Sequence, residues 1–276
     1  MVAWLMGLLA TLPASADNKV ETLFVKVGPT PLTAGRSADR DKAVVLVHGL
    51  GLHPFSSDKA LRARLRAWQQ GDSPIVKKLG EQADVYALAY GQNAAIDKIA
   101  DDPSLVRYLM HVKKAGYKEI ILVGHSAGGL IVRQLVEDHP ELGVTRVIQV
   151  CAPNAGSGWA SLKAATNAQM EFMVSLTRAF RLKALEKRGA KKIPASVEFV
   201  CVVGAYRLSG DGIVVAKSQW PLDLQAQGIP ALSLRATHWD AMKNPKTVEL
   251  LQKLVKEPQP RWDAKKVLES LKAIVP

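Results

Sequence analysis

The stretch from Ile120 to Leu130, which reads IILVGHSAGGL, constrains the fold of this 276-residue chain more than any other. A short apolar run leads into the spacing Gly-x-Ser-x-Gly, and an apolar pattern of helical period follows it. The glycines let the chain reverse within a few residues, because larger side chains beside the serine would collide. The pattern predicts a strand, a tight turn and a helix, with the Ser126 hydroxyl raised toward a base and a substrate. The alternative is a turn serine that only caps the helix.

Strand-like and helix-like segments alternate along the rest of the chain. We expect an edge strand at residues 20–27 and buried strands at residues 43–47, 84–90, 120–123, 146–150, 197–203 and 231–234. Helical patterns lie between them, including an amphipathic one at residues 61–68 and others that begin after Ser73, Asp102 and Asn244, each followed by proline. This order predicts an α/β protein with a mostly parallel central sheet and helices on both faces.

Three motifs together resemble the α/β-hydrolase superfamily, and within it the lipase and esterase branch. They are Val47-His48-Gly49-Leu50-Gly51, Gly124-His125-Ser126-Ala127-Gly128-Gly129 and Ala152-Pro153-Asn154-Ala155-Gly156-Ser157. In that branch the third motif often reads Thr-Pro-His-x-Gly-Ser, so Ala152 and Asn154 depart from it. The resemblance covers residues 43–244 and implies an α/β-hydrolase domain over residues 17–276.

The resemblance also implies the site residues, because the superfamily's chain order is serine, acid, histidine. His238 follows the last expected strand and is the expected base, whereas His48 is expected to be structural. Asp211 follows the strand at 197–203 and is the expected acid, with a turn aspartate bound to its own backbone as the alternative. Asp138 lies too far along the helix after Ser126, and Asp223 lies in a loop with no strand end close before it.

The resemblance implies carboxylic ester hydrolysis through an acyl-enzyme, without a metal or an organic cofactor. The backbone N–H groups of Leu50 and Ala127 are the expected oxyanion donors, since glycine neighbours allow a close approach to the negative oxygen. The expected substrate is a small-molecule or lipid ester. Two alternatives stay open: an acyltransferase with the same three residues, and a non-catalytic binding protein on the same fold.

Residues 158–192 interrupt the strand–helix alternation. Met173, Leu176 and Phe180 form an apolar stripe, and many Lys and Arg residues surround it. In related hydrolases an insertion at this point forms a cap, so we expect a helical cap with an apolar inner face and a basic outer face. The alternative is a solvated helix that packs on the core by the same stripe.

The N-terminal residues 1–16 are apolar and end in Ala14-Ser15-Ala16, a pattern that a signal peptidase accepts. We expect a signal peptide cleaved after Ala16 and export to the periplasm or the medium, although no Lys or Arg precedes the apolar run. The alternative is an ordinary segment packed on the fold.

Export would permit disulfides. Cys151 and Cys201 end two expected strands, and two buried thiols are favoured over a bridge.

The net charge of +12 has two interpretations. It either keeps the surface solvated or attracts the chain to an anionic membrane surface or another anionic ligand. The sequence has no basic-aromatic module, repeat or helix-turn-helix pattern of the kind that binds nucleic acid. We therefore expect no nucleic-acid partner.

Overall fold

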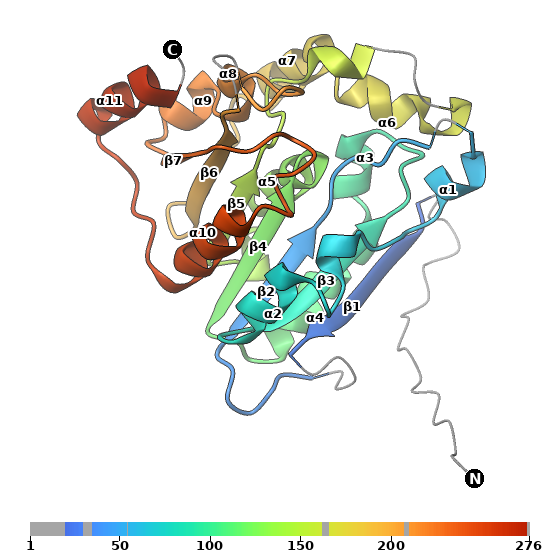
Figure 1. Ribbon diagram of the computed structural model, residues 1–276, viewed down its shortest axis with the longest axis vertical. Helices are drawn as coiled ribbons and strands as arrows, with labels where there is room; N and C mark the ends of the chain where they lie inside the picture. Colours follow the sequence, from blue (N-terminus) through green and yellow to red (C-terminus); the bar gives the residue numbers. More distant parts are fainter. Residues whose placement is uncertain (1–19, 30–34, 54, 162–165, 207–209, 275–276) are drawn as a thin grey trace.

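A seven-stranded sheet runs through the centre of the computed structural model, which describes residues 20–29, 35–53, 55–161, 166–206 and 210–274 (Figure 1). The expected signal peptide at residues 1–16 lies outside the described residues. The strands are β1 (Thr22–Gly28), β2 (Lys42–Val47), β3 (Asp84–Tyr90), β4 (Glu119–His125), β5 (Arg146–Val150), β6 (Glu198–Gly204) and β7 (Ala231–Leu234).

The strand order is β1-β3-β2-β4-β5-β6-β7. Only β1 runs antiparallel to its neighbour, and it occupies the edge of the sheet, as expected for residues 20–27. All other pairs are parallel, so the carboxyl ends of β2, β4, β5 and β6 lie at the same end of the sheet. The prediction of a mostly parallel sheet is confirmed, and the loops discussed below lie at this carboxyl end.

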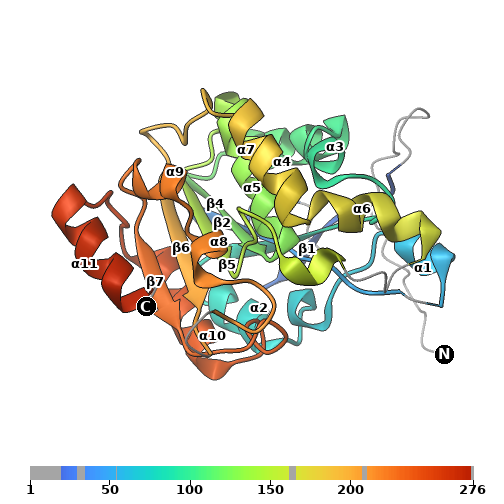
Figure 2. The ribbon, with the colours of Figure 1, turned by 90° about the horizontal axis from the view of Figure 1, so that it is seen from above.

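Helices cover both faces of the sheet (Figures 1 and 2). Helices α2 (Pro74–Gly80) and α10 (Pro245–Lys256) pack on one apolar cluster. Helices α4 (Pro103–Lys114), α5 (Ala127–Asp138) and α11 (Ala264–Ile274) pack on the other. The remaining helices are short: α1 (Ser57–Leu61), α3 (Ile96–Ala100), α6 (Met170–Ser175), α7 (Arg178–Lys187), α8 (Ala216–Gln219) and α9 (Leu222–Gln225). None of the described helices is long and apolar enough to cross a bilayer.

The three predicted helix starts are confirmed. The side chains of Ser73, Asp102 and Asn244 each accept a hydrogen bond from a backbone N–H of the first turn, and a proline follows each of them. These caps satisfy donors that a helix leaves unpaired.

The predicted continuous helix at residues 61–68 is wrong. Helix α1 ends at Leu61, Arg62 and Arg66 are extended, and a single 3₁₀ turn follows at Ala67–Gln69. The reason is tertiary: the Gln69 amide is buried and donates to Leu46 O at 2.9 Å and to Leu88 O at 3.1 Å. Those two bonds hold the segment against the ends of β2 and β3, and they outweigh a modest helix propensity.

The two cysteines are free and buried. Their strands are neighbours, but Cys201 belongs to the apolar cluster on one face of the sheet and Cys151 to the cluster on the other. Side chains alternate between the faces of a strand, so the two thiols point apart and cannot bond. The favoured interpretation of two buried thiols is confirmed.

Candidate active site

Ser126 lies between β4 and α5 in a strained conformation, with φ of 53° and ψ of −125°. Its backbone N–H donates to Val150 O at 2.8 Å, which ties the turn to β5. A side chain at Gly128 would come within 2.3 Å of Val47 O, and one at Gly124 within 2.6 Å of Gly128 O. The glycines of the motif are therefore required by close backbone packing, and the turn stores roughly 1–3 kcal/mol of strain.

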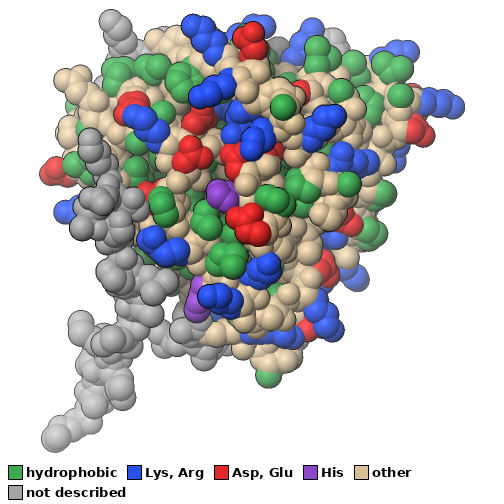
Figure 3. Space-filling view, turned by 180° about the vertical axis from the view of Figure 1, so that it is seen from behind, with side chains coloured by type: hydrophobic (Ala, Val, Ile, Leu, Met, Phe, Trp, Pro, Cys, Tyr) green, Lys and Arg blue, Asp and Glu red, His purple; other side chains and the backbone are tan. Residues whose placement is uncertain are grey.

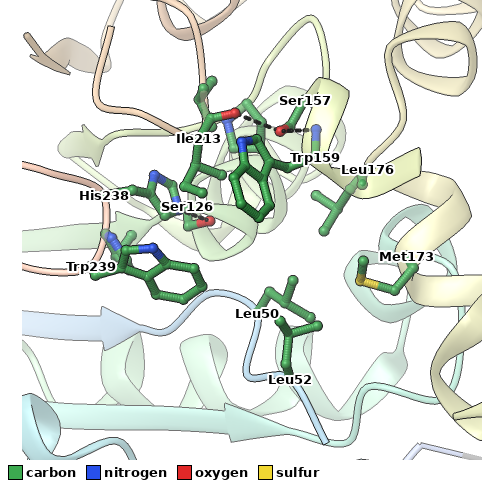
Figure 4. A pocket seen from close by; sticks show the side chains of 14 residues that line it. Leu50, Leu52, Ser126, Ser157, Trp159, Met173, Leu176, Ile213, His238 and Trp239 are labelled. Carbon is green, nitrogen blue, oxygen red and sulfur yellow. Dashed lines mark hydrogen bonds between the residues drawn. The ribbon is translucent and has the colours of Figure 1, made fainter. Parts of the chain in front are cut away.

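Three predicted residues from separate loops form one chain of hydrogen bonds. The Ser126 hydroxyl lies 2.9 Å from His238 Nε2 (Figure 4). His238 Nδ1 lies 2.7 Å from Asp211 Oδ2. The backbone N–H of His238 also donates to Asp211 O at 3.0 Å. All three side chains are buried. An imidazole between a hydroxyl and a carboxylate can remove the hydroxyl proton and carry the resulting charge.

The Asp211 carboxylate combines the two roles that the sequence left as alternatives. Oδ1 accepts the backbone N–H groups of Ile213 at 2.9 Å and Val214 at 2.7 Å, as a turn aspartate does. Oδ2 faces His238. The other two aspartates bind cations instead, Asp223 to Arg133 and Asp138 to Arg188, and neither has a bond to His238.

Gln219, which no sequence pattern pointed to, holds the Asp211 loop. Its buried Oε1 accepts the N–H of Gly204 at 2.7 Å. Its Nε2 lies 2.9 Å from Val214 O and 3.3 Å from Asp211 Oδ2. One amide thus joins the end of β6 to both sides of the acid loop. Glutamine is frequent on surfaces, and only the assembled fold shows that this one is enclosed.

The two predicted oxyanion donors lie beside Ser126. Ala127 is the first residue of α5, where a helix leaves its backbone N–H free. Leu50 follows β2, and a side chain at the preceding Gly49 would lie 2.5 Å from Ser126 Cβ, so this loop closely approaches the serine. No described acceptor bonds to the N–H of Leu50 or of Ala127. Both groups are therefore available to a substrate oxygen.

His48 has a structural environment, as predicted. Its Nδ1 donates to Gly49 O at 2.8 Å, its Nε2 accepts the Tyr90 N–H at 3.4 Å, and its ring stacks on Tyr90 at 4.5 Å between centroids. Burial, followed by the charge of Arg66, lowers the pKa of His48 to about 3. The imidazole therefore stays neutral, and its hydrogen bonds connect the loop after β2 to Tyr90.

A cavity of about 140 Å³ opens at the Ser126 hydroxyl (Figure 4). Met173 and Leu176, from the predicted cap segment 158–192, supply part of its wall. No Lys, Arg, Asp or Glu among the described residues lines it. The lining residues are Leu50, Leu52, His125, Ser126, Pro153, Ser157, Trp159, Ala160, Met173, Leu176, Ile213, Val214, His238 and Trp239. Such a cavity suits an uncharged apolar group.

Helix α7 of the same segment is tied to the body of the protein by ion pairs. Arg181 bonds Asp97 at 2.8 Å, and Arg188 bonds Glu137 and Asp138, each at 2.8 Å. The expected basic outer face is therefore incomplete, because these cations face core carboxylates. Lys183 and Lys187 remain exposed.

The described residues offer one cluster of potential metal ligands, Cys151, Asp211 and His238, whose ligand atoms lie within 4.8 Å of one another. The cluster fits a metal poorly. Both His238 nitrogens are already engaged by Asp211 and Ser126. Burial and the neighbouring Asp211 raise the pKa of the Cys151 thiol well above its usual value, whereas metals bind the thiolate.

The chain belongs to the α/β-hydrolase family, whose family model matches residues 44–267. The fold resembles that of the mature lipase BlEst2 of Bacillus licheniformis, with a TM-score of 0.62, 16% identity, and coverage of 84% of this chain and 98% of that one. A lipase-esterase related protein of Clostridium acetobutylicum gives a TM-score of 0.55, 12% identity, and coverage of 85% and 98%.

Lipase B of Aspergillus fumigatus gives a TM-score of 0.57 and 17% identity over 85% of this chain and 58% of that one. At these identities the likeness concerns the fold alone. The search of curated proteins gave no match to this sequence. The fold prediction is thus confirmed, and the chemistry must be argued from the site.

The Gln219 amide predicts a stability effect. Gln219→Met should leave the buried N–H of Gly204 without an acceptor and lower the free energy of unfolding by about 2–3 kcal/mol. Urea denaturation measures this. Gln252→Met is the matched control, because that amide bonds Glu81 at the surface, and its cost should stay below about 0.5 kcal/mol. Equal effects would contradict the assigned role of Gln219.

Proposed function

We propose that the chain is a serine hydrolase that cleaves carboxylic esters, with Ser126 as nucleophile, His238 as base and Asp211 as acid. The observation that carries the proposal is the chain of 2.9 Å and 2.7 Å hydrogen bonds at a strained, glycine-flanked turn. Backbone strain is retained where function needs a side chain in an otherwise unfavourable place. The family and the fold support hydrolysis as the reaction type.

The geometry supports the following reaction. His238 Nε2 takes the Ser126 proton as Oγ bonds to the ester carbonyl carbon, and the carbonyl oxygen becomes an oxyanion that accepts from Leu50 N–H and Ala127 N–H. His238 then gives the proton to the leaving alcohol as its C–O bond breaks. Water attacks the acyl-enzyme with His238 again as base, and the carboxylic acid leaves. Asp211 keeps the Nδ1–H tautomer and stabilises the imidazolium.

The cavity favours an acyl group without charge, carried by a small-molecule or lipid ester. Its lining is almost wholly apolar, and the cap segment 158–192 closes part of it through Met173 and Leu176. Release of free acid in the presence of a competing alcohol separates this proposal from an acyltransferase, which would form the new ester instead.

Removal of the nucleophile tests the proposal. Ser126→Ala should reduce p-nitrophenyl ester hydrolysis by at least about 10⁴-fold and leave the unfolding transition in place, because the change only removes a hydroxyl. A serine-directed phosphonate, followed by peptide mass spectrometry, should label Ser126 alone in the unmodified chain. Label on another serine would refute the assignment.

The acid is tested by a pair of substitutions. Asp211→Asn should keep the fold and lower kcat by about 10⁴-fold, since an amide favours the wrong tautomer of His238. Asp223→Asn weakens the pair with Arg133 and should change kcat less than about threefold while lowering stability. A steady-state comparison decides between them, and reversed effects would make Asp223 the acid.

We also propose that an anionic lipid surface is a partner. Exposed apolar side chains line the cavity: Leu52, Trp159 and Trp239 are 39%, 54% and 58% exposed. Phe55 and Val215, which follow the lining residues Leu52 and Val214 in sequence, are 98% and 50% exposed. Exposed Lys59, Lys217 and Lys243 follow these residues in sequence. A net charge of +12 repels a second copy and attracts anionic headgroups.

Positive and negative side chains are mixed on another face of the molecule. On the face shown in Figure 3, Lys and Arg side chains are interspersed with Asp and Glu. Charges of opposite sign thus offset one another on that face.

Binding to lipid vesicles tests whether an anionic lipid surface is a partner. Ser126→Ala protein should sediment with phosphatidylglycerol vesicles more than with phosphatidylcholine vesicles, and adding Phe55→Ser with Lys59→Glu should weaken binding about tenfold. The control pair is Leu222→Ser with Lys265→Glu, which changes exposed residues on α9 and α11, Leu222 being 78% exposed. Equal binding to both lipids would exclude the proposal. A dimer that the first pair disrupts would assign the surface to a second copy.

A further inference from the structure

The guanidinium of Arg66 packs against the loop that follows β2. A side chain at Gly51 would lie 2.0 Å from one terminal nitrogen of Arg66 and 2.4 Å from its Cζ. A side chain at Gly51 would have to shift the flexible end of Arg66, so the guanidinium lies directly against this glycine. Arg66 itself lies in the extended segment that the sequence predicted to be helical, just before the 3₁₀ turn at Ala67–Gln69.

This cation has no counter-ion in the part of the chain that the structure describes. Among the described residues, no carboxylate pairs with the Arg66 side chain and no acceptor bonds to it, although the side chain is half-buried. Burial lowers the pKa of Arg66, which the neighbouring Tyr90 hydroxyl only partly offsets. A desolvated charge without a partner destabilises a fold. The presence of this charge therefore suggests a function of Arg66 other than stabilising the structure.

The position of Gly51 places the charge beside the proposed oxyanion donors. Leu50 and Leu52 line the cavity, and between them Gly51 faces Arg66. A single thickness of backbone thus separates the guanidinium from the site. The Arg66 charge acts on neighbouring groups: after burial, it is the next cause that lowers the pKa values of His48 and His53. It is also the smallest cause of the lowered pKa of His125, after burial and the charges of His238 and His48.

We propose that Arg66 is a positioning residue for the oxyanion. Its charge acts through the Gly49–Gly51 backbone to stabilise the negative oxygen of the tetrahedral intermediate, without touching the substrate. The proposal rests on the proposed ester hydrolysis and adds a residue to it. Charges that interact across one chain thickness in a partly solvated site change a rate by roughly tenfold. A ground-state carbonyl carries little charge, so the effect falls on kcat and leaves KM unchanged.

One variant should show both effects of the Arg66 charge, the lower stability and the faster reaction. Arg66→Met keeps a long side chain against Gly51 and removes the charge. We expect kcat for a short p-nitrophenyl ester to fall about tenfold at unchanged KM, while Tm rises because a desolvated cation is gone. Inhibition by a trifluoromethyl ketone, which forms a tetrahedral oxyanion on the serine, should weaken by a similar factor.

Two further variants make the test specific. Arg66→Lys retains the charge and should keep kcat within about threefold of the unmodified chain. Arg64→Met removes an equal charge from an exposed side chain of the same segment and should change kcat less than about twofold.

Several results would overturn the proposal. They are an unchanged or increased kcat in Arg66→Met, a loss of kcat accompanied by a lower Tm, or an Arg66→Lys variant as slow as Arg66→Met. If the unmodified chain neither hydrolyses esters nor reacts with a phosphonate at Ser126, the proposed function itself fails. If it does both and Arg66→Met behaves like it, only this proposal fails.

Discussion

The structure depends on the close packing of backbone around Ser126. The serine keeps its positive φ because β4 and α5 meet at Gly124, Gly128 and Gly129, where any side chain would collide with a neighbour. The same contact brings Val47 O next to Gly128, so the loop after β2 is carried to the serine together with its free N–H groups. The proposed nucleophile and oxyanion donors are therefore positioned by a single packing constraint, which the parallel pairing of β2 and β4 imposes.

The proposed acid and base, Asp211 and His238, are fixed differently, by hydrogen bonds between loops. The backbone of His238 donates to Asp211 O, and the Asp211 side chain binds both its own turn and the imidazole. Gln219 joins this loop to Gly204 at the end of β6. Each bond contributes only about 1 kcal/mol, yet together they leave the carboxylate a single orientation.

The sequence predicted the parts of the fold and the site that depend on local pattern. The order of strands and helices, the turn at Ser126 and the caps before Pro74, Pro103 and Pro245 all follow from residues close together in the chain. The positions of His238 and Asp211 came from the chain order that the family resemblance implied, and the structure brings both to Ser126. The break after Leu61 and the enclosure of Gln219 could not be predicted. Both depend on partners far away in sequence, Leu46 and Leu88 for the segment that contains Gln69, and Gly204 for Gln219.

The buried and half-buried arginines show why charge counting from sequence is a poor guide to role. Arg133, Arg181 and Arg188 all have carboxylate partners, and those pairs fasten α5, α7 and α9 to one another and to α3. Such cations are explained by the structure they hold together, since removing either partner leaves a buried charge. Arg66 has no such partner among the described residues. Its guanidinium lies against Gly51 in the loop beside Ser126, and in the proposed reaction the oxyanion would supply a negative charge near it only while the intermediate exists.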